Sequence, residues 1–344
     1  MMNKRIVSVL VLAAFLVPVE LARTQQPQQP PPPPAESSQR QVVTVELVNL
    51  LATVLDRRQR FVTDLQKENF RVYEDNQLQT ISFFSRETDL PLRVGLLLDT
   101  SNSIRDRLQF EKDAAIDFLH ATVRRNVDLA FLMTFDTEAT VLQDYTDDVN
   151  TLQEVILRQR AGGNTALYRG IRYACDQLLT NPPAPKTENR EVRRVLVVIS
   201  DGVDSDPGGP SRGQAIEACQ RAGAVVYSIS TSTDWLSFSG DKTPTKYHKT
   251  EGDQVLEQFS EETGGRAFFP YRVDDLAQSF QDIGDELRSQ YSLAYTPKNR
   301  RADGAFRKIR VEVDSKGLTA RTRKGYFAPR PEARPARPAS DPSN

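Results

Sequence analysis

The chain has 344 residues, with 45 basic against 46 acidic side chains and a sequence pI near 6.3. This balance leaves no electrostatic footprint for nucleic acid or for an anionic membrane surface, so we do not expect a polyanionic partner. The length exceeds that of a usual single domain, which predicts one substantial core and a smaller satellite.

The N-terminus has the layout of a secretory signal. Lys4 and Arg5 precede an apolar run from Ile6 to about Val19, and small residues follow around Ala22. A membrane span needs roughly 20 apolar residues, so this run is short for one. We interpret residues 1–24 as a signal peptide, which predicts export to the periplasm or release, with no membrane span after cleavage. An uncleaved anchor stays as the alternative.

Two further segments have compositions that cannot form a core. Residues 25–40 are rich in proline and glutamine, and we expect a stiff, extended linker there. The C-terminal residues 329–344 alternate proline, arginine and small residues, which indicates a disordered tail.

Strand patterns occupy two separate segments, 41–88 and 289–328. In the first, "FRVYEDNQLQTISFF" predicts a hairpin that turns at Asp75 and Asn76. In the second, alternation predicts strands over 290–297, 305–314 and 318–327, the last two joined by a Ser-Lys-Gly turn. Neither segment is long enough for a good core of its own. We expect the two to pack together as one small β-sandwich-like domain.

The middle of the chain, about 91–288, alternates two other patterns. Continuous apolar runs at 93–99, 128–135, 193–201 and 224–230 are typical of strands buried on both faces, and amphipathic stretches separate them. This alternation predicts an α/β fold, a doubly wound and mostly parallel sheet flanked by helices. Ligands of such sheets bind beyond the carboxyl ends of the strands.

Oxygen-bearing side chains gather at those predicted strand ends. Asp99, Ser101 and Ser103 follow the first run, Asp201 ends the third, and Thr165 follows a glycine-rich turn. Two carboxylates and three hydroxyls, without histidine or thiolate, suit one Mg²⁺ ion better than Zn²⁺. Each residue also has an ordinary explanation. Ser103 with Asp106 fits a helix capping box, Thr165 fits a helix N-cap and Asp201 fits a turn. Their joint placement favours the metal.

Asp99-x-Ser101-x-Ser103, Thr165 and Asp201 resemble the metal-ion-dependent adhesion site of the von Willebrand factor A domain. The resemblance covers about 91–288, and the flanking strands, with "TGGRAFF" at 263–269, are similar to a von Willebrand factor A-related family of Acidobacteria. It implies one Mg²⁺ or Mn²⁺ ion with an open coordination position that a carboxylate of a partner protein fills. It also implies direct coordination by Ser101 and Ser103, by Thr165 in the ligand-competent state, and by Asp99 and Asp201 directly or through water.

The resemblance leaves two functions open. The first is an exported, cation-dependent adhesion or recruitment module that binds an Asp or Glu of a partner protein. The second is a structural or assembly component of the cell envelope in which the metal mainly stabilises the loops. We do not expect an enzyme, because the G-x-S-x-G match at 209–213 follows a polar loop rather than a strand, and only His120 and His248 are available as bases. The sequence gives no oligomeric state.

Three other features each allow more than one interpretation. Cys175 and Cys219 lie in predicted helices, where we favour two separately buried thiols over the disulfide that export permits. Asp204 and Asp206 fit a solvated turn better than a second, calcium-like site. The loop 232–252 contains Trp235, Phe238 and Tyr247, which fit partner contacts and attachment to the body equally well.

Overall fold

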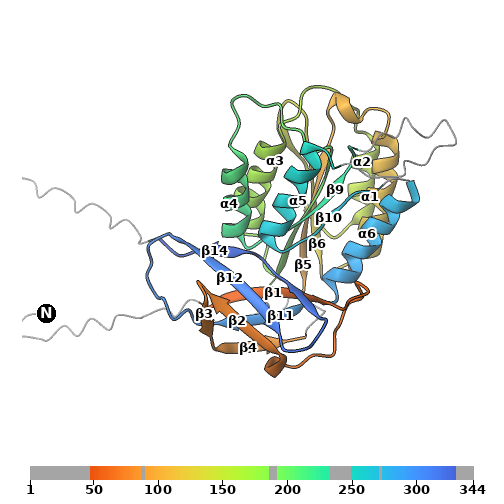
Figure 1. The fold of residues 1–344 in the computed structure, drawn as a ribbon. Coiled ribbons are helices and arrows are strands. Elements are labelled where there is room, and N and C mark those ends of the chain that lie inside the picture. The colour runs from red at the N-terminus through yellow and green to blue at the C-terminus, as the bar shows by residue number, and fades with distance from the viewer. Residues whose placement is uncertain (1–46, 87–89, 186–191, 233–248, 271–272, 331–344) are drawn as a thin grey trace, which may run out of the picture. The chain divides into compact units, whose positions relative to one another are not determined.

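The computed structural model describes residues 47–86, 90–185, 192–232, 249–270 and 273–330 (Figure 1). The predicted signal peptide, the Pro/Gln linker and the C-terminal tail lie outside these ranges, apart from the tail's first two residues. Within the ranges, no helix combines the length and the apolar character that crossing a membrane requires.

Six strands form the central sheet, in the order β10-β9-β8-β5-β6-β7. All neighbours are parallel except β7, which runs antiparallel to β6 at the edge. The predicted strands are confirmed, and β7 is an addition that the sequence did not predict because most of its side chains are only partly buried. The bounds are β5 Leu92–Asp99, β6 Leu129–Phe135, β7 Ala139–Thr146, β8 Arg193–Ser200, β9 Val225–Ser230 and β10 Ala267–Phe268.

Helices cover both faces of this sheet (Figure 1). On one face lie α1 (Leu108–Thr122), α2 (Val149–Leu157) and α6 (Val273–Leu287), which share a core with Leu96 and Leu98 of β5. On the other lie α3 (Leu167–Tyr173) with its π-helical continuation Ala174–Leu179, α4 (Arg212–Ala222) and α5 (Glu251–Thr263), packed around Leu97. The predicted doubly wound α/β fold is therefore confirmed.

The remaining strands form two four-stranded sheets, each of which combines strands from both ends of the chain. Their orders are β13-β1-β11-β4 and β14-β12-β2-β3. Side chains of both sheets meet in one core that includes Phe70, Val72 and Tyr291. The expected β-sandwich-like module is thus present. Its strands are β1 Val48–Leu55, β2 Phe70–Glu74, β3 Gln77–Gln79, β4 Ile81–Ser85, β11 Tyr291–Tyr295, β12 Phe306–Val313, β13 Thr319–Arg321 and β14 Gly325–Phe327, with a 3-10 turn at Lys67–Asn69.

One predicted hairpin is confirmed and another is wrong. Asp75 and Asn76 both have positive φ, 47° and 66°, as the tight turn between β2 and β3 requires. The segment 318–327 is instead two short strands, since β13 pairs with β1 and β14 pairs with β12. Between them the Lys324 amide donates to Glu262 O of α5 at 3.3 Å, so contact with the helical domain interrupts the strand.

A buried polar cluster joins the sandwich to the helical domain. The Glu286 carboxylate at the end of α6 accepts hydrogen bonds from Thr53 Oγ1 of β1 and from the Tyr227 hydroxyl of β9, both at 2.9 Å. It also forms an ion pair with Arg321 of β13. Because a buried charge needs partners, these contacts constrain β1, β9, α6 and β13 at one place.

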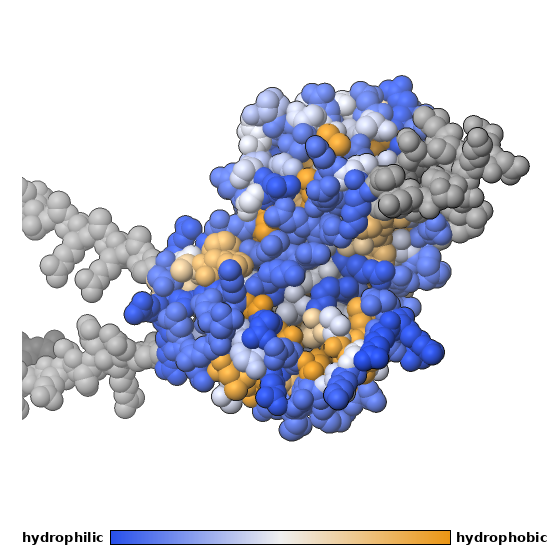
Figure 2. All heavy atoms as spheres, viewed as in Figure 1, coloured by the Kyte–Doolittle hydropathy of each residue, from blue (hydrophilic) through white to orange (hydrophobic). Residues whose placement is uncertain are grey.

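The surface differs between the two halves. On the face in Figure 2, hydrophobic residues are more frequent over the β-rich part than over the helical part. Exposed large side chains of the sandwich include Leu78 of β3, Phe83 of β4 and Phe306 of β12.

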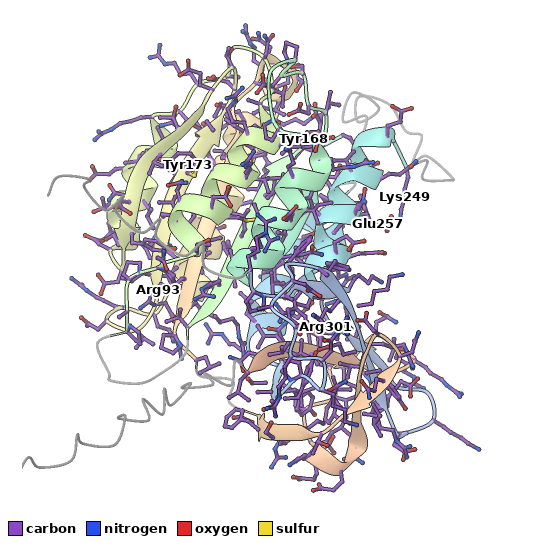
Figure 3. The ribbon with its side chains drawn as sticks, turned by 90° about the vertical axis from the view of Figure 1, so that its left-hand side faces the viewer. Arg93, Tyr168, Tyr173, Lys249, Glu257 and Arg301 are labelled. Carbon is purple, nitrogen blue, oxygen red and sulfur yellow. A yellow bond between two sulfur atoms is a disulfide. The ribbon has the colours of Figure 1, made fainter. Side chains whose placement is uncertain are left out.

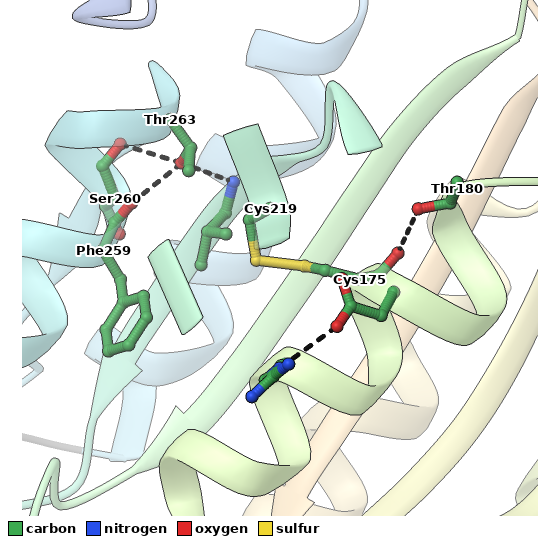
Figure 4. Close-up of a disulfide and its surroundings, with 9 residues drawn as sticks. Cys175, Thr180, Cys219, Phe259, Ser260 and Thr263 are labelled. Atoms are coloured by element: carbon green, nitrogen blue, oxygen red, sulfur yellow. Dashed lines mark hydrogen bonds and ion pairs between the residues drawn. A yellow bond between two sulfur atoms is a disulfide. The ribbon is translucent and has the colours of Figure 1, made fainter. Parts of the chain in front are cut away.

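Cys175 and Cys219 form a disulfide between the end of α3 and α4 (Figure 4). Their Cα atoms lie 4.9 Å apart, and both side chains are fully buried. The expectation of two separate thiols is therefore wrong. Two helices on the same face of the sheet bring the cysteines together, and their spacing along the chain gave no sign of it.

The disulfide closes a loop across 44 positions, so its removal releases the unfolded chain from a constraint. We expect the double substitution Cys175→Ala with Cys219→Ala to lower the free energy of unfolding by about 2–4 kcal/mol. Urea denaturation followed by circular dichroism measures the change. An unchanged denaturation midpoint for the double variant would show that the bridge does not contribute to stability.

Candidate metal centre

The predicted site residues lie at the carboxyl edge of the central sheet. Strands β5 and β8 are parallel neighbours with Leu98 opposite Ile199, so Asp99 and Ser200 end side by side. Figure 3 shows Arg93 near the opposite end of the sheet and Tyr168 close to the edge where the site lies. Parallel pairing therefore gathers the loops that follow β5 and β8 at one edge.

Asp99 is fully buried, and both of its carboxylate oxygens accept hydrogen bonds. Oδ1 accepts from the backbone amide of Ser101 at 2.8 Å, and Oδ2 accepts from Ser200 Oγ at 2.7 Å. Burial raises the pKa of Asp99 to about 6, against the lowering effect of its bonds to Ser101 and Ser200, and the charge of Asp201 adds to the rise. The fold thus holds this carboxylate in an environment that disfavours its negative charge.

Ser101 and Ser103 place their hydroxyl oxygens 2.9 Å apart. Ser101 is buried and Ser103 is exposed, so this pair extends from the buried side of the site to its solvent-exposed side. Neither serine caps a helix with its side chain: the 3-10 turn Asn102–Ile104 has no side-chain cap, and α1 begins at Leu108 after Arg107. The capping interpretation therefore does not account for either hydroxyl.

Thr165 is 6% exposed and lies just before α3. Its amide donates to Ser205 Oγ at 2.9 Å, and its carbonyl accepts from the Ser205 amide at 2.8 Å. The N-cap of α3 is Ala166 and makes no side-chain bond, so Thr165 is not the cap. Both of these bonds use the backbone of Thr165 and do not involve its hydroxyl.

Asp201 is partly exposed, and its Oδ1 accepts from the Val203 amide at 3.0 Å. The turn interpretation is to this extent correct. The next residue, Gly202, has φ of 78°, and a Cβ there would lie 2.2 Å from Gly252 O. Glycine is therefore required for the turn after Asp201 to pack against the start of α5.

Direct hydrogen bonds connect the three loops pairwise. Ser200 bonds to Asp99 between the ends of β8 and β5, and the Thr165 amide bonds to Ser205 between the second loop and the third. Between the first loop and the second, the Gly162 amide donates to Thr100 O at 2.8 Å. The protein's own bonds therefore hold these loops together.

The residues present fit a hard divalent cation. The predicted set provides oxygen atoms only, and Asp99 is a buried carboxylate that a cation would compensate. Across the described residues no three His, Cys, Asp or Glu side chains cluster as metal ligands do. The predicted set has just two acids and depends on hydroxyls for the rest, so the assignment of Asp99, Ser101, Ser103, Thr165 and Asp201 as ligands stays a prediction.

Sequence reasoning missed two residues of this edge. Ser200 donates to Asp99 and accepts from the Gly202 amide at 3.1 Å, and its only signal was a polar residue at the end of an apolar run. Glu111 of α1 is fully buried, and burial raises its pKa well above the ordinary value, with the charges of Asp99 and Asp201 adding to the rise. Its signal was an acid on the apolar face of a predicted helix.

The other candidate residues have structural roles. Asp204 accepts from the Tyr168 amide at 3.0 Å and Asp206 forms an ion pair with Arg169, which supports the turn interpretation. Ser211 of the G-x-S-x-G match caps α4 by accepting from the Gln214 amide. His120 contacts Gln153 on the helix surface. Most of the aromatic loop, including Trp235, and His248 lie outside the described residues.

Several solved structures are similar to this chain at low identity. A von Willebrand factor type A protein from Catenulispora acidiphila is 10% identical, with a TM-score of 0.44, over 78% of this chain and 76% of that one. Proximal thread matrix protein 1 from the mussel byssus, with a zinc-occupied MIDAS motif, is 17% identical over 62% and 49%, with a TM-score of 0.44. An aerotolerance-related membrane protein from Bacteroides fragilis is 18% identical over 57% and 98%, with a TM-score of 0.41.

A protein-family model identifies the part of the chain that carries the site. None of the curated proteins matches the chain. The model of the von Willebrand factor type A domain matches residues 94–203, which run from β5 to just beyond β8. This range includes all five predicted ligands. The chain therefore contains a von Willebrand factor type A domain.

Proposed function

We propose that this protein is an exported module that binds a partner protein through a divalent cation, Mg²⁺ or Mn²⁺, at the carboxyl edge of the central sheet. Asp99, Ser101, Ser103, Thr165 and Asp201 would hold the ion. The bound cation would supply a coordination position for an Asp or Glu carboxylate of the partner. The neighbouring loops would supply the choice of partner.

The gradient of exposure across the site carries this proposal. Asp99, Ser101 and Thr165 are buried, whereas Asp201 is partly exposed and Ser103 is exposed. A cation placed among them has protein oxygens on one side and solvent on the other. That arrangement suits an ion that exchanges a water for a ligand from outside, rather than an ion enclosed for stability alone.

The bonds between the loops weigh against the alternative, an envelope assembly component whose loops need the metal for stability. Ser200 with Asp99, and Thr165 with Ser205, already connect the three loops through protein atoms. The cation is then not needed to hold the loops together, and its proposed role is to bind the partner. We propose no catalytic role. The proposed export rests on the interpretation of residues 1–24 as a signal peptide.

Replacement of the buried carboxylate tests the proposal. Asp99→Asn keeps the shape of the side chain and removes the charge, so we expect it to abolish Mg²⁺ binding measured by titration calorimetry. Capture of envelope proteins by the purified chain should fall to the level seen for the wild-type protein in EDTA.

Asp206→Asn is the matched control, because it changes an acid of a neighbouring loop that pairs with Arg169 outside the site. This control should bind Mg²⁺ and capture partners as the wild type does. Equal, chelator-sensitive capture by Asp99→Asn and wild type would disprove the metal bridge. A marked loss of fold in Asp99→Asn would instead favour the assembly role.

The raised pKa of Asp99 predicts a pH dependence with a defined sign. Between the ordinary value of 3.8 and about 6, the folded chain holds a proton on Asp99 that the unfolded chain has released. The cation-free protein should therefore gain stability as the pH falls through this window, by about 1 kcal/mol from pH 7 to pH 5 relative to Asp99→Asn. Urea unfolding in EDTA measures this difference.

In saturating Mg²⁺ the trend should reverse, because protons and the cation compete for Asp99. The stabilisation that Mg²⁺ provides should decline as the pH falls below about 6. Parallel pH profiles for the wild type and Asp99→Asn in both conditions would contradict this prediction.

A further inference from the structure

Glu111 is a buried carboxylate that the local structure does not explain. It is fully buried in the first turn of α1, and neither oxygen has a hydrogen-bond partner among the described residues. The Thr231 hydroxyl at the end of β9 lies close enough to favour the charged form, although it too makes no hydrogen bond of normal geometry. An unpaired buried acid is costly, so its presence needs a reason.

The position of Glu111 on its helix is one that packing would fill with an apolar residue. Leu108 lies three residues before it and Ala115 lies four residues after it, and both belong to the core under α1. The neighbouring Lys112 offers no partner, since its ammonium group donates to the carbonyl oxygens of Leu157 and Gln159 near the end of α2. Helix packing therefore gives no reason for a carboxylate here.

Other buried acids in the described residues have partners, which sets Glu111 apart. Asp128 bonds to Arg124, and Glu74 accepts from the hydroxyls of Tyr295 and Tyr326 at 2.8 and 3.0 Å. Glu286 has the buried cluster described above. Each of these carboxylates is satisfied by protein atoms alone.

The charges that act on Glu111 belong mainly to the predicted metal centre. Asp99 and Asp201 act on it with negative charge, and Arg107, four residues earlier in the chain, acts on it with positive charge. Thr231 marks the same edge of the sheet, because its amide donates to Ser200 O at 2.9 Å. Three carboxylates thus share one end of the domain.

We propose that Glu111, in the first turn of the helix that follows the Asp99 loop, is a further acidic residue of the cation centre, and that the divalent ion is its missing counter-charge. This inference rests on the proposed cation-binding function. Glu111 acts as a positioning residue through space: it raises the affinity for the ion by its charge, without a place in the ligand set predicted from the sequence. A carboxylate that is costly in the cation-free protein becomes favourable once a double positive charge lies above it.

Two variants test the charge separately from the packing. Glu111→Gln removes the charge at constant shape, and Glu111→Met fills the same volume with an apolar side chain. Each should weaken Mg²⁺ binding about tenfold in titration calorimetry, as expected when one buried charge is lost. Both should be at least as stable as the wild type to urea in EDTA, because a buried unpaired carboxylate has been removed.

Mn²⁺ gives a second readout, which separates a charge that acts through space from direct coordination of the ion. A charge that acts through space should weaken Mg²⁺ and Mn²⁺ by the same factor, and so leave the ratio of their dissociation constants unchanged. The control Glu74→Gln alters a buried carboxylate of the sandwich, outside the site, and should leave both dissociation constants unchanged.

The possible outcomes separate this inference from the function on which it rests. If the wild type binds Mg²⁺, Asp99→Asn does not, and both Glu111 variants bind as tightly as the wild type, only the role of Glu111 is overturned. If the wild type binds no Mg²⁺, the cation centre itself fails and Glu111 loses its proposed role with it. If neither Glu111 variant folds, the residue is structural and the inference is also overturned.

Discussion

The structure depends on the complete burial of one strand, β5, between two parallel neighbours and two layers of helices. All eight of its residues are buried, with Leu96 and Leu98 in one core and Leu97 in the other. A strand in this position can meet solvent only beyond its end. Asp99, the last residue of the strand, is held by β8 on one side and by the loop that follows it on the other. The placement of the candidate site follows from this constraint.

The same constraint explains why negative charge is unfavourable at the edge where the candidate site lies. Asp99 and Glu111 are both fully buried, and only Asp201 of the three acids reaches solvent. Hydrogen bonds from Ser101 and Ser200 offset only part of the cost for Asp99, whose pKa stays raised. Hydrogen bonds between protein atoms hold the loops in place, so the unfavourable burial of Asp99 and Glu111 is already part of the folded state before any ligand binds. Such preorganisation is what a tight cation site requires.

The sandwich shows how one domain can be assembled from two chain segments that lie on either side of an inserted domain. Strand β1 pairs with β11, which follows α6 directly, and β12 pairs with β2. Glu286 then connects the end of α6 to β1, β9 and β13 through hydrogen bonds and an ion pair. The last helix of the α/β domain, α6, is thereby fixed to the sandwich, which segments from both sides of that domain build.

The sequence by itself determined the strands buried on both faces, the helices between them and the strand ends at which Asp99 and Asp201 lie, because hydrophobic periodicity and strand-end position are local properties. It also indicated that the two outer β segments belong together, since neither can bury a core alone. It did not reveal β7, the division of 318–327 between two sheets, the pairing of Cys175 with Cys219, or the isolation of Glu111. Only the tertiary structure decided these, because each depends on which distant segment packs alongside. A helix packs against a helix at the disulfide, α5 packs against residues 322–324, and Glu111 meets no hydrogen-bond partner among the described residues.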